Sequence, residues 1–174
     1  MLSEHVDCWN NQGFCDPFSS SQFSERQRSY PGFRIYTPQA MVDGRVDAVG
    51  SDRSAIETAV KASLSDPHGT STLDRCDPLQ LKIRIDQLPN GHAAADVVVA
   101  FVENGLSVQV EHGENAGRTL KHVAVVRSLE TVASADGPAW SGEVKPHGTL
   151  RAVVFVQERK SRHVLASAMK QRMR

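Results

Sequence analysis

The sequence has no excess of charge of either sign, because 20 Lys and Arg residues balance 20 Asp and Glu residues. Electrostatic binding to nucleic acid requires a basic excess, so we expect no nucleic-acid partner. The basic residues at the C-terminus, such as Lys170, Arg172 and Arg174, are typical of a solvated chain end. The chain also has no apolar run near the ~20 residues that cross a bilayer, so we expect no membrane span.

Cysteine is scarce, which limits redox chemistry. The chain has only Cys8, Cys15 and Cys76, too few for a disulfide scaffold, and no Cys-x-x-Cys motif. Cys8 and Cys15 lie in an Asn- and Gly-rich segment that offers no helix N-terminus to activate a thiol. They are a candidate disulfide in an oxidising compartment and two free thiols in a reducing one.

Signals for a metal, a cofactor or a catalytic residue are absent. His5, Asp7, Cys8 and Cys15 lack the paired short spacings of zinc sites, so we predict no metal. Segment 113–118 has two glycines and an arginine, but not the spacing or the lysine of a Walker loop. No Gly-x-Ser-x-Gly nucleophile elbow occurs, and we predict no cofactor and no catalytic residues. The other histidines are expected in surface turns and strands: His68, His92, His112, His122, His147 and His163.

The first half of the chain predicts two helices and a hairpin. A helix over 21–30 begins after serines that can cap it, and Pro31-Gly32 ends it. Segments 39–42 and 45–49 form a hairpin across Asp43-Gly44, a dipeptide suited to a tight turn. A second helix follows, whose apolar stripe has a period of four: Ile56, Val60 and Leu64.

The second half predicts a module of antiparallel strands. The polar link 66–77 marks the domain boundary, and beyond it the hydrophobic period changes to two over 79–86. Asn104-Gly105 is a hairpin turn between two strands. The final segment, 164–170, is compatible with a strand or a helix. Short strands at regular spacing indicate a sandwich or a partial barrel; they are expected at 79–85, 96–102, 106–111, 120–132, around Trp140, and at 150–157.

Several blocks of the chain, in order and spacing, resemble a bacterial family catalogued as domain of unknown function 1223. Family members carry a thioredoxin-like domain followed by a β-rich module. The resemblance covers nearly the whole chain, although the Cys-x-x-Cys part and the export signal of the family are missing from it. The matching blocks are 5–9, 16–18, 25–28, 36–39, 42–44, 49–53, 113–120, 125–127 and 153–157.

The resemblance implies a fold class and a site. It implies an α+β chain with a partial, truncated thioredoxin-like domain at 1–70 and an antiparallel β module at 77–174. It also implies a cis bond at Thr37-Pro38, in a loop that faces a peptide or a protein thiol. Family members are usually exported, but this chain as written has no signal peptide and is expected in the cytoplasm.

For function, the resemblance implies a non-catalytic remnant or fragment of a family of uncharacterised function. One alternative is a binding or structural protein that acts through its β module. Another is a thiol–disulfide oxidoreductase, either through a restored N-terminal part or through Cys8 and Cys15.

Overall fold

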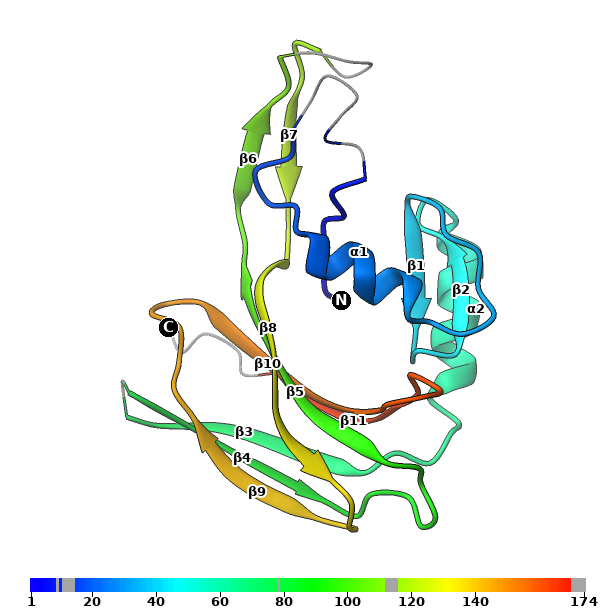
Figure 1. Cartoon of the computed structure of the whole chain (residues 1–174), viewed down its shortest axis with the longest axis vertical. Coiled ribbons are helices and arrows are strands. Elements are labelled where there is room, and N and C mark those ends of the chain that lie inside the picture. Colours follow the sequence, from blue (N-terminus) through cyan, green and yellow to red (C-terminus); the bar gives the residue numbers. More distant parts are fainter. Residues whose placement is uncertain (9, 11–14, 78, 112–115, 170–174) are drawn as a thin grey trace.

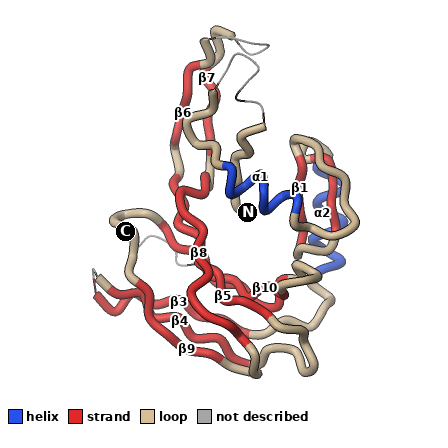
Figure 2. Tube along the Cα trace, viewed as in Figure 1, coloured by secondary structure: helices blue, strands red, loops and turns tan. Residues whose placement is uncertain are grey.

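A computed structural model describes residues 1–8, 10, 15–77, 79–111 and 116–169 of the 174-residue chain. Strands dominate this part, and its two helices lie in the first half of the sequence (Figures 1 and 2). In chain order the elements are α1 (Ser21–Arg28), β1 (Gln39–Val42), β2 (Val46–Val49), α2 (Arg53–Ser63), β3 (Thr70–Asp77), β4 (Gln80–Asp86), β5 (Ala95–Glu103), β6 (Leu106–Gln109), β7 (Thr119–His122), β8 (Val125–Ala135), β9 (Trp140–Val144), β10 (Arg151–Glu158) and β11 (Val164–Met169).

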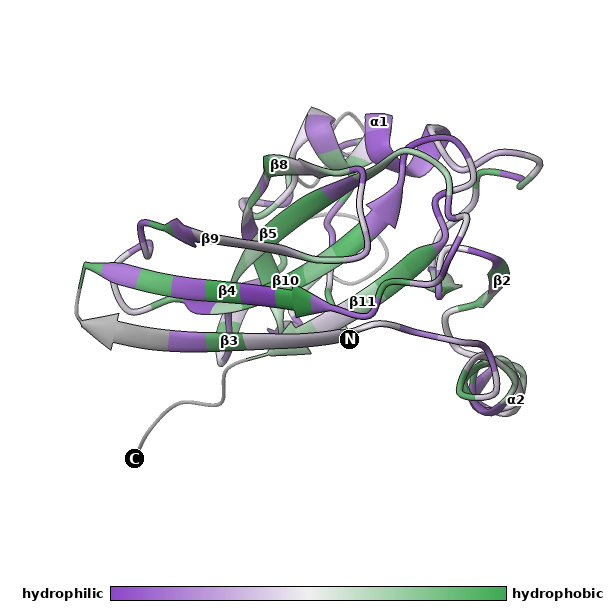
Figure 3. Ribbon diagram, turned by 90° about the horizontal axis from the view of Figure 1, so that it is seen from below, coloured by the Kyte–Doolittle hydropathy of each residue, from purple (hydrophilic) through white to green (hydrophobic). Residues whose placement is uncertain are grey.

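Two antiparallel sheets share the main core. One has the strand order β11-β10-β5-β8 and the other the order β3-β4-β9. β4 illustrates how the sequence builds this packing, because Leu81, Ile83 and Ile85 are buried while the polar residues between them are exposed. Figure 3 shows this alternation as green and purple bands along β4. β6 and β7 pair with each other as a separate two-stranded ribbon.

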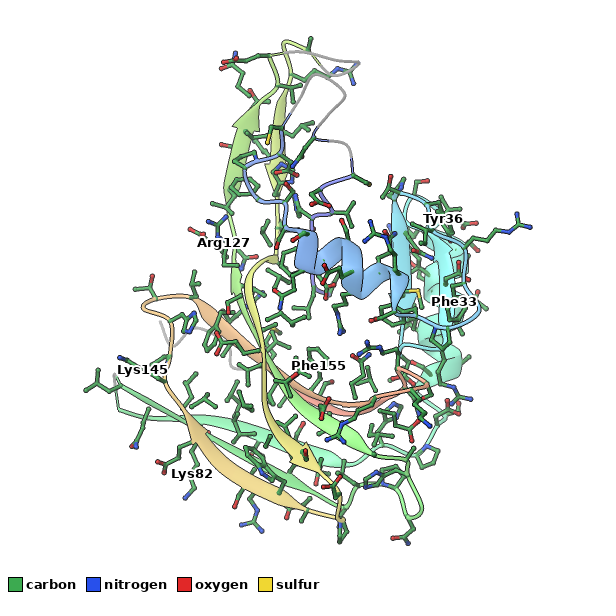
Figure 4. The ribbon with its side chains drawn as sticks, in the orientation of Figure 1. Phe33, Tyr36, Lys82, Arg127, Lys145 and Phe155 are labelled. Atoms are coloured by element: carbon green, nitrogen blue, oxygen red, sulfur yellow. The ribbon has the colours of Figure 1, made fainter. Side chains whose placement is uncertain are left out.

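Strand β5 is apolar on both faces. Val97, Val99 and Phe101 belong to the core between the two sheets, and the residues that alternate with them belong to a second cluster on the opposite face. Phe155 of β10 lies in this second cluster, and Figure 4 shows it on the side of the sheet toward α1. Phe23 of α1 completes the cluster and is only 3% exposed. The first helix is therefore held by the sheet of the second half.

The hairpin β1–β2 and helix α2 form a smaller unit beside the sandwich (Figure 1). Asp52 caps α2, because its carboxylate accepts a hydrogen bond from the Ala55 N–H at 3.0 Å. The hairpin turn at Asp43-Gly44 lies against the turn between β10 and β11. There a Cβ on Gly44 would lie 1.7 Å from the Arg162 carbonyl oxygen, so only glycine fits at this close approach.

The predicted fold class is wrong. We expected an α+β chain that opens with a truncated thioredoxin-like segment, but the described chain is mostly β, with several antiparallel sheets. The physical reason is that both faces of β5 are apolar and each must be covered. α1 covers the second face, so it packs on the sheet of the second half. The β-sandwich expected for the second half is broadly compatible with the structure.

Several local predictions are confirmed. Both helices and the hairpin over β1 and β2 occur where the sequence placed them, and so do most strands of the second half. Two predictions are wrong: the expected link 66–77 contains strand β3, which pairs with β4, and the strand expected over 120–132 is divided into β7 and β8. The segment left open between strand and helix is strand β11. None of the described helices is long and apolar enough to cross a membrane. The domain boundary between residues 70 and 77 stays a prediction.

Candidate functional site

The Thr37-Pro38 loop is exposed, and its peptide bond is cis. The Gly50 N–H donates to the Pro38 carbonyl at 2.7 Å, which joins the loop to the end of β2. On the side of α1, the Gln27 side-chain amide donates to the Tyr36 carbonyl at 2.8 Å. Figure 4 labels Tyr36 beside β1. The loop is thus held from two sides while Thr37 and Pro38 face solvent.

Exposed apolar side chains are frequent in the segment of the chain that contains this loop. Among the described residues, nine large hydrophobic side chains are exposed, and five of them lie between residues 35 and 64. The largest exposed fraction among these five is 78%, at Leu64 on α2. Exposed apolar side chains mark an interaction site where they form one continuous patch. The five residues are Ile35, Val46, Val49, Val60 and Leu64.

The structure has Cys8 and Cys15 as free, exposed thiols. No disulfide joins them in the structure, and pairing in an oxidising compartment stays a prediction. The side chain of Cys76 lies outside the described residues.

Three side chains that are far apart in the sequence meet where the hairpin turn contacts the sandwich. Asp43 Oδ1 lies 3.2 Å from His68 Nε2, and Asp43 Oδ2 lies 3.2 Å from His163 Nε2. The potential ligand atoms of the three residues all lie within 4.8 Å of one another. The Asp43 side chain is 9% exposed and those of His68 and His163 are 29% and 18% exposed. We call this group the Asp-His-His cluster.

Electrostatics within the cluster favour positive charge next to Asp43. Burial by itself would lower the pKa of His68, but hydrogen bonds with Asp43 and with the Asp66 carbonyl outweigh it and raise that pKa. The carboxylate of Asp43 therefore attracts a proton or another cation to this position.

A second group of aromatic and acidic side chains lies near the N-terminus. His5 Nδ1 is 2.6 Å from Asp16 Oδ2, and the rings of His5 and His122 are 4.9 Å apart between centroids. Phe18 packs edge-on against both histidines. Burial, followed by the charge of His5, lowers the pKa of His122. This group ties the N-terminal segment to β7.

A small polar cavity of about 140 Å³ lies between α1 and the four-stranded sheet. Gln22 and Arg26 of α1 line one side, and Gln157 and Arg162 line another. The Gln157 amide donates to the Arg162 carbonyl at 2.6 Å, while its own Oε1 has no partner among the described residues. The volume and the polar lining suit a water molecule rather than an organic ligand.

The chain is thus a mostly β protein with an exposed hairpin–helix unit. A family model described as "Protein of unknown function (DUF1223)" matches residues 1–157, and the chain belongs to this family. The crystal structure of protein AGR_C_4864 from Agrobacterium tumefaciens is similar, with a TM-score of 0.79 and 22% identity. The similarity covers 99% of this chain and 82% of that one, and at this identity it shows the fold alone. No curated protein matches the sequence.

The sequence alone predicted only part of these features. Thr37 and Pro38 were proposed as the site, and the structure leaves that role open while showing both residues exposed. The Asp-His-His cluster was missed, because Asp43 was expected only as a turn residue and His68 and His163 as surface histidines. Their separation in the sequence carries no motif. The nearest signal is the Asp43-Gly44 turn itself, since its glycine permits the close approach to Arg162.

Proposed function

We propose that the protein is a non-catalytic binding protein that takes an extended segment of a partner protein on the β1–β2–α2 unit, beside Thr37-Pro38. The observation that carries this proposal is the concentration of exposed apolar side chains on this unit, described above. Burying each of them against a partner would contribute about 1.5–3 kcal/mol if the burial were complete.

The outer edge of β1 supports an extended ligand. Because the Gly50 N–H donates to the Pro38 carbonyl, this pair is hydrogen-bonded, and antiparallel alternation turns the backbone groups of Gln39 and Met41 away from β2. No strand of the described chain pairs with this edge. A peptide added as a further strand would supply hydrogen bonds along the edge, and alternate side chains would contact the apolar surface.

The test is fluorescence anisotropy with short labelled peptides of high β-propensity, made with and without a cysteine. The variant Ile35→Ser/Leu64→Ser should weaken binding at least about tenfold, since two apolar contacts are lost. The matched control is Leu79→Ser/Val123→Ser, which removes two exposed apolar side chains from the second half of the chain. The proposal fails if no peptide binds or if both double variants weaken binding equally.

The same experiment separates the second candidate, binding through the β module. The exposure of Leu79 (70%) and Val123 (58%) favours this candidate. If only the control pair weakens binding, the partner contacts the β module and the hairpin–helix unit has another role.

The free, exposed thiols of Cys8 and Cys15 favour a third candidate, thiol–disulfide exchange. A thiolate of the protein would attack a disulfide of a partner, forming a mixed disulfide and releasing one partner thiol. The second protein thiolate would then attack the mixed disulfide, forming a Cys8–Cys15 disulfide and releasing the second partner thiol. Thiol titration before and after incubation with a disulfide-containing peptide tests this candidate. Loss of two protein thiols with matching release of peptide thiol supports exchange, and an unchanged count of protein thiols rules it out.

A further inference from the structure

We propose that Asp43, His68 and His163 form a binding site for a divalent transition-metal ion, and that Zn²⁺ is the ion that fits best. The site lies on the described part of the chain where the hairpin turn of β1 and β2 meets the turn between β10 and β11. Asp43 lies in the turn of the hairpin that carries the proposed peptide surface, but the test of the metal site does not depend on peptide binding.

Two distances match the spacing of zinc ligands, and the ligand atoms of all three residues lie within 4.8 Å of one another. Zinc bonds to histidine nitrogen at about 2.0–2.1 Å and to carboxylate oxygen at about 2.0–2.2 Å, so two ligands of a tetrahedral ion lie about 3.3 Å apart. Each Asp43 oxygen lies 3.2 Å from an Nε2 atom of one histidine. A ligand set of two imidazoles and one carboxylate binds Zn²⁺ and related transition-metal ions in preference to Mg²⁺ or Ca²⁺.

Two buried atoms of the cluster point to a missing partner. Within the described residues, Asp43 Oδ2 and His163 Nε2 make no hydrogen bond, although they face each other at 3.2 Å. The Asp43 side chain is 9% exposed, so water reaches its carboxylate poorly. Leaving such groups without a partner costs free energy. A cation between them would be bound by both atoms.

The orientation of His68 is that of a metal ligand. Its Nδ1 lies 2.9 Å from the Asp66 carbonyl oxygen, which can only accept, so Nδ1 carries the hydrogen. Nε2 lies 3.2 Å from Asp43 Oδ1, so without a metal a hydrogen between the two atoms satisfies both, and a metal ion that displaces this hydrogen would meet the Nε2 lone pair. Histidines that bind metals usually donate their second N–H to a carbonyl or carboxylate in this way.

Backbone hydrogen bonds hold the segments that carry the three residues close together. The Val164 N–H donates to the Asp43 carbonyl at 3.1 Å, and the Gly69 N–H donates to the Leu165 carbonyl at 2.8 Å. The first bond joins the hairpin turn of β1 and β2 to strand β11, and the second joins the chain before β3 to the same strand. A bound ion would add a further link between these three segments. Three protein ligands also leave a fourth tetrahedral position for water or for a group of a partner.

The experiment is isothermal titration calorimetry of the full chain, purified without a histidine tag, with Zn²⁺ and with Mg²⁺ as the comparison ion. Cys8, Cys15 and Cys76 are replaced by serine in all samples, since thiolates bind zinc themselves. We expect one Zn²⁺ per chain and no Mg²⁺ binding. Co²⁺ should give the intense visible absorption of a tetrahedral site.

The matched variants are His163→Gln and His92→Gln. Loss of His163 removes one of three ligands and should weaken Zn²⁺ binding at least about 100-fold, while His92→Gln should leave it unchanged. His68→Gln is the second test variant, because His68 is more exposed than His163 and its loss disturbs the fold less. Zinc should raise the melting temperature of the parent protein and of His92→Gln only.

Two results overturn the proposal. One is the absence of stoichiometric Zn²⁺ binding to the cysteine-free protein, which would leave a proton as the only cation shared by the three side chains. The other is equal Zn²⁺ affinity of His68→Gln, His163→Gln and His92→Gln, which would assign the ion to other residues.

Discussion

The sandwich and the β1–β2–α2 unit use similar sequence patterns with different results. In the sandwich, the alternating residues of β4 and the continuous apolar run of β5 are buried almost completely. In the smaller unit, Ala59 is the only buried residue of α2. Val60 and the C-cap residue Leu64 belong to the apolar stripe of this helix, and their side chains are 41% and 78% exposed. A periodic apolar stripe therefore predicts a helix well, but it predicts burial only where another element is available to cover it.

Helix α1 shows that a helix without an apolar stripe can still be covered by the sheet. Its sequence is more polar than that of α2, yet Phe23 is 3% exposed because it packs against Val98, Ala100 and Val102 of β5. A single aromatic side chain of α1 is thus buried more completely than the apolar stripe of α2. The burial of Phe23 follows from the apolar outer face of the four-stranded sheet, which α1 covers.

The sharpest test of the comparison replaces one aliphatic side chain in each region. Ile83→Ala in β4 should lower the free energy of unfolding by about 2–5 kcal/mol, since Ile83 is completely buried. Leu64→Ala on α2 should change it by no more than about 0.5 kcal/mol, since this side chain is largely exposed. Urea unfolding measures both. A large cost for Leu64→Ala would mean that α2 is covered in solution by a second molecule.

The contact between the two regions is tested at Gly44. Gly44→Ala should cost about 1–3 kcal/mol more than Gly91→Ala, because its Cβ would overlap the Arg162 carbonyl. Gly91 is the matched control, since its φ of +74° is close to the +70° of Gly44 and no atom lies within 4 Å of its Cβ. Thermal unfolding measures the difference. Equal costs would show that the hairpin turn does not depend on this contact for stability.

The smallest expected effect concerns the attachment of the N-terminal segment through His122. Its pKa is lowered in the folded state, so below the ordinary histidine pKa of about 6.5 the unfolded chain binds more protons than the folded one. Stability contributed by the neutral ring is thus present above that pH and is lost as the pH falls toward the lowered value. His122→Phe should flatten this part of the stability curve.

The measurement is urea unfolding of both proteins at several pH values between about 5 and 7.5. Comparing the slopes isolates the contribution of His122, because the two proteins differ at this residue alone. If the variant keeps the slope of the parent, His122 does not contribute to it.

Most of the local structure followed from the sequence, although strand β3 lies in a segment that was expected to be a polar link. The period of two in β4, the apolar run of β5 and the turns at Asp43-Gly44 and Asn104-Gly105 each depend on neighbouring residues only. The same local signals did not predict the fold class. They described the segment around α1 correctly, but they could not state that it packs on β5 and β10.

The two candidate sites also differ in whether local sequence could predict them. Thr37-Pro38 is a contiguous motif, so a resemblance could propose it. The Asp-His-His cluster joins a hairpin turn, the link before β3 and the turn before β11, and no local pattern connects these segments.

The sequence by itself determined where both helices, most strands and the hairpin turns form, because hydrophobic period, capping residues and glycine turns act over a few neighbouring residues. Only the tertiary structure decided that α1 covers the outer face of the four-stranded sheet, that α2 stays half exposed, and that Asp43 meets two distant histidines. The physical reason is that burial and ligand geometry depend on which surfaces meet, and the pairing of surfaces is a property of the whole chain.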